Sequence, residues 1–316
     1  MAKLQSSEIV GVANRPATIC SNTMCIWFDT TNLKTVISYC GYGGAGVWST
    51  GGALIIGRAT YWGAGTQNAG LVAGGYINAK VSCTEEYNGT SWSVGGALIT
   101  ARYGLAGAGT QNEAFATGGN IGGTLVGCTE EYNGTSWSAG GALITGTNYF
   151  AGAGTQNAGL VAGGYINAFA SCTEEYNGTS WSAGGALITA RCSLAGAGTQ
   201  NVGLAVGGYI GVGVKCTEEY NGTSWSAGGA LITARYASAG AGTQNEGLAA
   251  GGYILSCTEE YNGTSWSAGG ALIIARGYFA GAGSQGAGLV AGGWTGVGIS
   301  CTEEYNKALA IIDSTQ

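Results

Sequence analysis

Short apolar runs separated by glycine and polar residues recur along the chain, and one period of this pattern predicts four strands. Between residues 102 and 145 the order is RYGLAGAGTQN, EAFATGG, GCTEEY and NGTSWSAGGALIT. The apolar runs are short, end at Gly or Asn, and lack the 3.6-residue spacing of a helix. Asn133-Gly134 also predicts a type I′ hairpin turn, with positive φ at both central residues. We therefore predict four antiparallel strands per period.

The pattern repeats through most of the chain. The string CTEEYNGTSW, truncated to CTEEYN in the last copy, begins at six cysteines spaced by 41 to 45 residues: Cys83, Cys128, Cys172, Cys216, Cys257 and Cys301. Four strands per period of this length are typical of a β-propeller blade. Each period also holds one GAG segment, which suits the crowded innermost strand, and one Trp, which suits the outer strand.

The position of the sixth Trp segment predicts how the ring closes. The last copy ends at CTEEYN, whereas Trp48, in VWSTGGALIIG, matches SWSAGGALIT. We predict that the Trp48 strand completes the last blade, which gives six blades and removes free sheet edges. In the alternative, residues 16–45 form a degraded blade and Ala308–Asp313 supplies a last strand, which gives seven blades.

The repeats divide the chain into three predicted regions. A propeller spans residues 45–306, an N-terminal arm or capping hairpin spans 1–44, and a C-terminal tail spans 307–316. In the arm, CIWFDTTNLKTVISY predicts two strands joined at Thr30–Leu33. The chain has no run of 18 apolar residues, and its start does not resemble a secretory signal. We therefore expect neither a membrane span nor secretion.

The order of landmarks in each period resembles the kelch repeat of β-propellers. Each copy has an apolar run, a Gly pair and a Tyr, with a Trp five residues after the Tyr in the five complete copies. The Gly pairs are Gly74-Gly75, Gly118-Gly119, Gly163-Gly164, Gly207-Gly208, Gly251-Gly252 and Gly292-Gly293; the Tyr residues are Tyr87, Tyr132, Tyr176, Tyr220, Tyr261 and Tyr305; the Trp residues are Trp92, Trp137, Trp181, Trp225 and Trp266, with Trp48 as the sixth. More narrowly, GTQN and TEEYNGTSW resemble kelch-like repeats of marine bacteriophages, often in tail-fibre-like genes.

Paired glutamates recur once per period and account for 12 of the 17 acidic residues. They are Glu85-Glu86, Glu130-Glu131, Glu174-Glu175, Glu218-Glu219, Glu259-Glu260 and Glu303-Glu304. Two carboxylates can perform glycosidase chemistry, but neighbouring strand residues point to opposite faces, so one pair cannot flank one bond. The first Glu shares its face with Cys and Tyr, and once buried it needs a partner. We predict that it contacts a recurring arginine, which Thr147 replaces in one copy: Arg58, Arg102, Arg191, Arg235 and Arg276.

Composition narrows the chemistry further. Charged residues make up 9% of the chain, the net charge of −6 offers no basic surface to nucleic acid, and His is absent. The chain thus lacks the usual general base and the commonest metal ligand, and no Gly-rich segment forms a phosphate loop. We expect no enzymatic activity, no cofactor and no metal.

The remaining motifs have structural interpretations. Asn-Gly-Thr matches the glycosylation sequon, but the turn explains it without a sugar. The six repeat cysteines lie too far apart to pair, and we interpret them as small buried hydrophobic residues. Cys20, Cys25 and Cys40 match no strong metal-ligand spacing, so their role stays open.

The near-identical copies differ mainly at the start of the inner strand and in the link after the Gly pair. In a four-strand meander the links after strands two and four emerge on the same side, so we predict that the variation converges on one face. Aromatic residues there can stack on sugar rings or anchor a protein; in the alternative they only pack between blades. The candidate ligand-binding residues are Tyr61, Trp62, Tyr103, Tyr149, Phe150, Tyr236, Tyr278, Phe279 and Trp294.

The resemblance implies a non-enzymatic structural or receptor-binding propeller of a bacteriophage virion or tail. It would bind a host-surface glycan or protein through the variable aromatic face, and residues 1–44 would contact neighbouring virion or tail subunits. It would be made in the host cytoplasm and reside in the virion. One alternative is a kelch-type protein-interaction scaffold in the bacterial cytoplasm. Another, a propeller glycosidase or lyase, is disfavoured by the absence of His and by the unbroken repeat symmetry.

Overall fold

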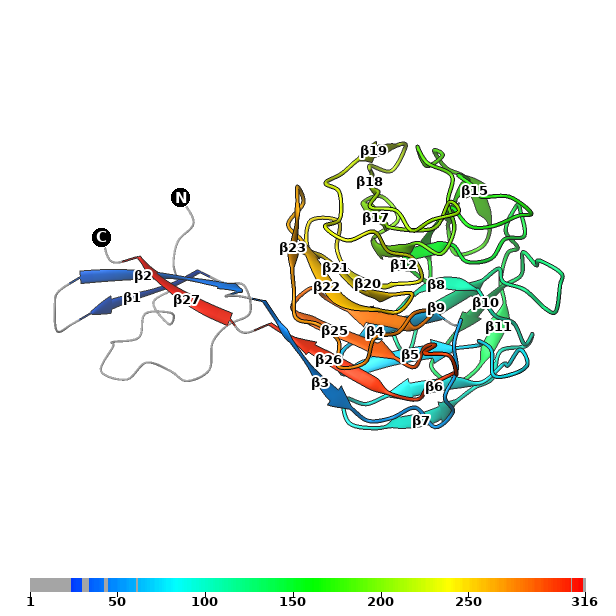
Figure 1. Cartoon of the computed structure of the whole chain (residues 1–316), viewed down its shortest axis with the longest axis horizontal. Helices are drawn as coiled ribbons and strands as arrows, with labels where there is room; N and C mark the ends of the chain where they lie inside the picture. The colour runs from blue at the N-terminus through cyan, green and yellow to red at the C-terminus, as the bar shows by residue number, and fades with distance from the viewer. Residues whose placement is uncertain (1–23, 30–33, 43–44, 61, 308, 315–316) are drawn as a thin grey trace. The chain divides into compact units, whose positions relative to one another are not determined.

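The computed structural model describes residues 24–29, 34–42, 45–60, 62–307 and 309–314. The regular secondary structure of these residues consists of β-strands (Figure 1). The chain divides into two compact units, Val47–Asn306 and Met1–Gly46 with Lys307–Gln316. No helix in the described ranges is long and apolar enough to cross a membrane.

The larger unit is a six-bladed β-propeller of four-stranded antiparallel sheets. The first three blades consist of β4 (Trp62–Thr66), β5 (Ala69–Ala73), β6 (Thr84–Tyr87) and β7 (Trp92–Gly95); β8 (Ala106–Gly109), β9 (Ala114–Thr117), β10 (Thr129–Tyr132) and β11 (Trp137–Ala139); and β12 (Ala151–Thr155), β13 (Ala158–Ala162), β14 (Thr173–Tyr176) and β15 (Trp181–Ala183). The last three consist of β16 (Ala195–Gly198), β17 (Gly203–Val206), β18 (Thr217–Tyr220) and β19 (Trp225–Ala227); β20 (Ala239–Gly242), β21 (Gly247–Gly252), β22 (Leu255–Tyr261) and β23 (Trp266–Ala268); and β24 (Ala280–Gly283), β25 (Ala287–Ala291), β26 (Thr302–Asn306) and β3 (Val47–Gly51).

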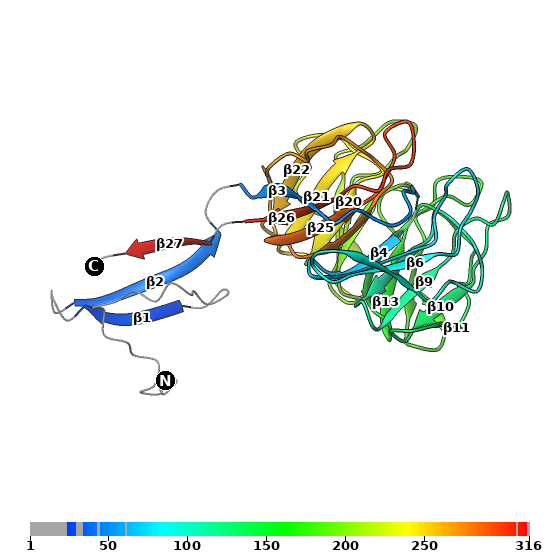
Figure 2. The ribbon, with the colours of Figure 1, turned by 90° about the horizontal axis from the view of Figure 1, so that it is seen from below.

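The sixth blade closes the ring as the sequence predicts. β3 pairs antiparallel with β26 (Figure 2). In this pairing Trp48 lies opposite Tyr305. The innermost strands β4, β8, β12, β16, β20 and β24 contact one another in a closed cycle. The predicted six-bladed architecture is therefore confirmed, and the seven-bladed alternative is wrong.

The segments that the alternative assigned to a seventh blade form a separate three-stranded sheet. β1 (Met24–Asp29) pairs antiparallel with β2 (Lys34–Tyr42), which pairs antiparallel with β27 (Leu309–Ser314). The predicted break between the first two strands, at residues 30–33, lies outside the described residues, as do Cys20 and the side chains of Cys25 and Cys40. Residues 307–316 thus group with residues 1–46 in one compact unit.

Glycine permits the inner strands to approach one another closely. A Cβ added at Gly152 in β12 would lie 2.4 Å from the carbonyl oxygen of Gly107 in β8. Real Cβ atoms essentially never come within 3.0 Å of another heavy atom. The GAG segment therefore marks the innermost strand because a larger residue there would push adjacent blades apart.

Three side chains of each blade, a Tyr, a Trp and a Gln, donate hydrogen bonds to the preceding blade. Between blades two and three, the Tyr176 hydroxyl donates to Glu131 at 2.5 Å, and the Trp181 indole N–H donates to Thr129 Oγ1 at 2.9 Å. Gln156 Nε2 donates to the Tyr132 carbonyl oxygen at 2.7 Å. Equivalent contacts occur at all six interfaces. The Tyr, the Trp, the Gln of GTQN and the second Glu of each pair therefore hold the ring together.

The first Glu of each pair is buried and acts within its own blade. In five blades its carboxylate forms an ion pair with the recurring arginine, as at Arg58–Glu85 and Arg276–Glu303, where the N–O distances are 2.6 and 2.7 Å. It also accepts hydrogen bonds from two backbone N–H groups, for example those of Ile55 and Ile56. These contacts tie the link that enters each blade to its third strand.

Blade three keeps the carboxylate but lacks the arginine. Glu174 is buried and accepts hydrogen bonds from the Ile144 and Thr145 N–H groups at 2.8 and 3.1 Å. Thr147 occupies the arginine position, and its hydroxyl donates to the Tyr165 carbonyl oxygen at 3.4 Å. Burial without a nearby cation raises the pKa of the Glu174 carboxyl above its ordinary value.

Two local predictions need correction. Asn133 keeps a negative φ and only Gly134 is left-handed, so the predicted type I′ turn is wrong. Asn133 Oδ1 instead accepts hydrogen bonds from the N–H groups of Thr135 and Ser136, which closes a longer loop. The six repeat cysteines are free thiols, but they are half-buried rather than buried because they lie where a link meets the third strand.

Candidate functional site

A ring of backbone hydrogen bonds surrounds the propeller axis where the chain enters the inner strands. In each blade one residue just before the inner strand has a left-handed conformation, with φ between 52° and 65°: Thr60, Gly104, Tyr149, Ser193, Ala237 and Tyr278. Each of the six donates its N–H to the carbonyl oxygen of its counterpart in the preceding blade, at 2.6–2.9 Å. The closed cycle compensates for the steric cost of a positive φ at five non-glycine residues.

Two tyrosines of this ring meet across the axis. Tyr149 belongs to blade three and Tyr278 to blade six, so they lie on opposite sides of the ring, and their ring centroids are 6.1 Å apart at an interplanar angle of 63°. Burial raises the pKa of Tyr149 well above its ordinary value and that of Tyr278 to about 12, and neighbouring tyrosines add to both shifts. Both phenols are therefore neutral over the physiological pH range.

This tyrosine pair is the centre of a continuous row of aromatic contacts across one face. Neighbouring ring centroids in the row lie 4.9–6.5 Å apart. The aromatic row runs through Tyr76, Tyr103, Tyr149, Tyr278, Tyr253, Tyr236, Tyr209, Phe169 and Tyr165. All six blades contribute to it by ring contacts, which exceeds what the packing of one interface between blades requires.

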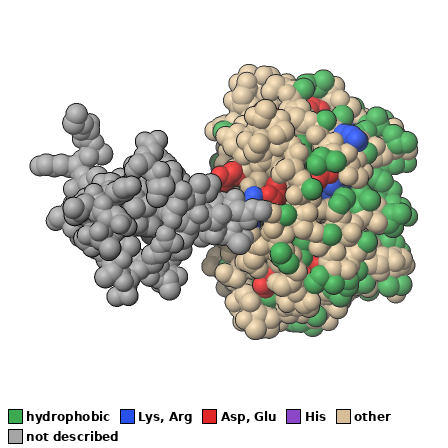
Figure 3. All heavy atoms as spheres, turned by 60° about the vertical axis from the view of Figure 1, so that its left-hand side comes forward, with side chains coloured by type: hydrophobic (Ala, Val, Ile, Leu, Met, Phe, Trp, Pro, Cys, Tyr) green, Lys and Arg blue, Asp and Glu red, His purple; other side chains and the backbone are tan. Residues whose placement is uncertain are grey.

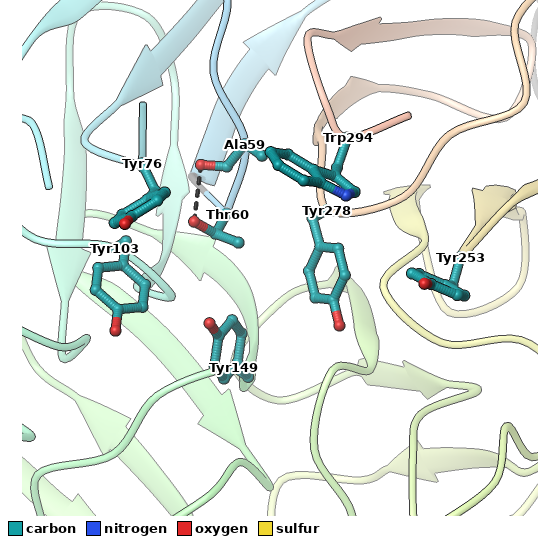
Figure 4. A pocket seen from close by; sticks show the side chains of 8 residues that line it. All are labelled: Ala59, Thr60, Tyr76, Tyr103, Tyr149, Tyr253, Tyr278 and Trp294. Carbon is teal, nitrogen blue, oxygen red and sulfur yellow. Dashed lines mark hydrogen bonds between the residues drawn. The ribbon is translucent and has the colours of Figure 1, made fainter. Parts of the chain in front are cut away.

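A pocket of about 340 Å³ lies within this row (Figure 4). Tyr76 and Tyr103 lie on one side of it, and Tyr278, Trp294 and Tyr253 lie on the other. Ala59, Thr60 and Tyr149 complete the lining, and the Thr60 hydroxyl donates to the Ala59 carbonyl oxygen at 2.8 Å. The described lining contains no charged side chain. We call this space the axial pocket.

The two variable segments lie side by side, as the meander predicts. The residue before the inner strand forms a β-bridge with the residue after the Gly pair, for example Tyr103 with Asn120 and Gly277 with Trp294. The link after strand four also lies beside the link after strand two, since the Leu98 N–H donates to the Ser82 carbonyl oxygen at 2.8 Å. One face of the propeller therefore carries both sources of variation.

The same layer of links exposes aliphatic side chains. One isoleucine per blade follows a buried leucine and is 52–63% exposed: Ile55, Ile99, Ile144, Ile188, Ile232 and Ile273. Tyr76, Tyr165, Tyr253 and Trp294 are each about 40% exposed. Figure 3 shows hydrophobic side chains gathered along one side of the propeller. Exposed apolar groups concentrated on one face are typical of a binding surface.

The candidate residues from the sequence fall into two groups. Tyr103, Tyr149, Tyr278 and Trp294 line the axial pocket, and Tyr236 lies farther along the aromatic row. Trp62, Phe150 and Phe279 are 6–8% exposed and belong to the hydrophobic core. Phe150 and Phe279 directly follow the left-handed residue, which turns successive side chains from the axis into the space between blades. Tyr61 lies outside the described residues.

Sequence reasoning missed the tyrosine that follows the Gly pair in four blades. These residues are Tyr76, Tyr165, Tyr209 and Tyr253, and all four belong to the aromatic row. Because four copies share this Tyr, the sequence pattern indicates a structural role for it rather than a binding role. The available signal was its position, directly before the most variable link of each repeat.

The arrangement is suited to binding. The paired glutamates are occupied in framework contacts, and no group of three Cys, Asp or Glu side chains within the described ranges could hold a metal ion. The axial pocket instead offers neutral aromatic faces, phenol hydroxyls and an indole N–H on a fixed backbone ring. No protein-family model matches the chain, and no curated protein sequence matches it.

Proposed function

We propose that this propeller is a non-enzymatic structural and receptor-binding module of a bacteriophage virion or tail, and that its aromatic face binds a glycan or protein of the host surface. The observation that carries the proposal is the aromatic row with its axial pocket, set in a face of exposed apolar side chains. The resemblance of the repeats to kelch-like repeats of marine bacteriophages supplies the biological setting.

The remaining parts of the molecule fit this role. The unit that contains β1, β2 and β27 is separate from the propeller and is our candidate for attachment to other virion or tail subunits. The net charge of −6 disfavours contact with nucleic acid. The hydrogen bonds that three side chains form across every blade interface suit a protein that must stay closed outside the cell. The protein would be made in the host cytoplasm and assembled into the particle.

Particle association tests the structural half of the proposal. An antibody against the propeller should detect the protein in particles purified from an infected culture that carries the gene. Recovery only from the soluble cytosol, bound to a cellular protein, would favour an intracellular interaction scaffold instead. Turnover of a polysaccharide by the purified chain would contradict the non-enzymatic assignment.

Cell labelling tests the receptor-binding half. Fluorescently labelled full-length protein should bind host cells, and Tyr253→Ala on the aromatic face should reduce that binding at least tenfold. Val202→Ala is the matched control, since Val202 is an exposed apolar residue in the link between strands one and two, at the opposite end of its blade. Equal binding by both variants would place the contact surface elsewhere.

A further inference from the structure

We propose that the axial pocket is a binding site for a single pyranose ring of a neutral glycan, held between aromatic faces and by phenol hydroxyls. This inference rests on the proposed function and narrows it, because it commits the centre of the aromatic face to a sugar rather than a protein.

The electrostatics of the pocket disfavour an anionic ligand. Its lining is Ala, Thr, Tyr and Trp, with no arginine or lysine to pair with the carboxylate of an acidic sugar. An anion entering it would lose hydration without gaining a partner. The phenol of Tyr278 stays protonated because burial and neighbouring tyrosines raise its pKa to about 12, so the described lining offers a cation no formal negative charge and only the faces of its aromatic rings.

The polar atoms of the pocket favour a polyhydroxylated ligand. It presents the hydroxyls of Tyr76, Tyr103, Tyr149, Tyr253 and Tyr278 and the indole N–H of Trp294. None of these six groups makes a side-chain hydrogen bond to another described residue. Aromatic side chains that served only packing would need no such groups. A sugar supplies hydroxyls that both donate and accept, so it can satisfy several of them at once.

The shape of the pocket fits one sugar ring. Tyr76 and Tyr103 form one wall, with ring centroids 5.4 Å apart and planes at 68°, and Tyr253 and Tyr278 form another at 6.4 Å and 77° (Figure 4). Steep angles present both ring faces and ring edges, so a pyranose can stack on one wall while its hydroxyls meet the other. A volume of about 340 Å³ is near the lower limit for ligand pockets and is too small for a folded partner segment.

The pocket is held in place before any ligand arrives. Thr60, Tyr149 and Tyr278 belong to the closed cycle of six backbone hydrogen bonds. This cycle fixes the backbone positions from which their side chains project into the pocket. Little backbone ordering is therefore needed on binding. For a ligand as small as a monosaccharide we expect a Kd on the order of 1 mM.

The test is titration of the full-length protein with methyl glycosides of neutral hexoses, followed by calorimetry and by tryptophan fluorescence. At least one glycoside should bind, and Trp294→Ala should abolish that binding. Tyr103→Phe, which removes one hydroxyl and keeps the ring, should raise Kd about fivefold. Val202→Ala is the control, since Val202 is an exposed apolar residue between β16 and β17, outside the aromatic row, and the Kd of that variant should be unchanged. Thermal unfolding of each variant verifies that the fold is retained.

Three results would overturn the inference. One is tighter binding of glucuronate or choline than of any neutral glycoside, and another is glycoside binding that Trp294→Ala leaves intact. The third is no binding by any neutral glycoside, monomeric or oligomeric, while Tyr253-dependent labelling of host cells persists. In that case the face recognises a protein, and the receptor-binding function stands without the sugar site. Conversely, glycoside binding by a chain absent from particles and from cell surfaces would refute the proposed function alone.

Discussion

Replacing Thr147 with arginine should stabilise the propeller, because blade three already contains the groups that hold this arginine elsewhere. In blade four, Arg191 pairs with Glu218 and donates to the carbonyl oxygens of Thr189, Ala205 and Gly207. The corresponding groups in blade three are the carboxylate of Glu174 and the carbonyl oxygens of Thr145, Val161 and Gly163. Glu174 is buried, so it carries the desolvation cost of a charge without the ion pair.

The size of the effect follows from the cost of an uncompensated buried charge. Removing one partner of a buried ion pair costs about 3–5 kcal/mol, so supplying the missing partner should recover about 3 kcal/mol, allowing for the ordering of a long side chain. In a unit of this size such a gain raises Tm by roughly 6–12 °C. Thr145→Arg is the matched control: it adds the same charge to the same link, but Thr145 is exposed and should change stability little.

The pH dependence of the gain separates an ion pair from mere filling of space. Burial raises the pKa of Glu174 in the folded wild type, so the folded state binds more protons than the unfolded state and stability falls as pH rises through that pKa. In the Thr147→Arg variant the guanidinium would lie beside Glu174 and lower the pKa of its carboxyl instead. The difference in unfolding free energy between Thr147→Arg and wild type, measured with urea, should therefore grow from pH 4 to pH 7. A gain that is equal at both pH values, or a loss at pH 7, would refute the reasoning.

Three further predictions concern the ring. Tyr176→Phe removes the hydroxyl that donates to Glu131 and should lower the unfolding free energy by about 2 kcal/mol in urea titrations; no change would mean that this contact between blades is dispensable. Gly152→Ala places a Cβ against the Gly107 carbonyl and should cost about 1–3 kcal/mol, measured in the same way, whereas wild-type stability would show that the inner strands can separate freely. The pKa of Tyr176 is raised to about 12 by burial and by its hydrogen bond to Glu131, so stability should be retained below about pH 10 and fall between pH 10 and 12; unfolding midpoints across this range check it, and a flat profile contradicts it.

The fold could be predicted from the sequence because the spacing of the repeats gives the length of a blade, and the incomplete copies at the two ends show how the ring closes. The Trp48 segment lacks a partner in its own neighbourhood, and the CTEEYN copy at Cys301 lacks a Trp segment, so the two ends predict each other. The sequence allowed the recurring arginine to be assigned to the first glutamate, because a buried carboxylate is costly unless a cation compensates its charge. The second glutamate gave no such signal, since its partner is a tyrosine of the next blade and no local pattern spans that interface.

The site was less accessible because repetition hides function when the functional residue is itself repeated. Tyr253 and its counterparts recur beside the Gly pair, and nothing in one copy distinguishes a Tyr that faces the axis from a Tyr that packs. Phe150 shows the opposite error. It lies in a variable segment, but the left-handed residue before it changes the direction of successive side chains. Strand alternation cannot be followed through such a residue from sequence alone.

Blade six combines the first and the last propeller segments to leave the ribosome. β3 can pair with β26 only after residues up to Asn306 have been synthesised, and their pairing then closes a loop that spans the entire ring. A chain released before Thr302 would keep both strand edges open, and open edges pair readily with other chains. We therefore expect the propeller to finish folding only after β26 has left the ribosome, and chains terminated before Thr302 to assemble with one another rather than to remain as defective monomers.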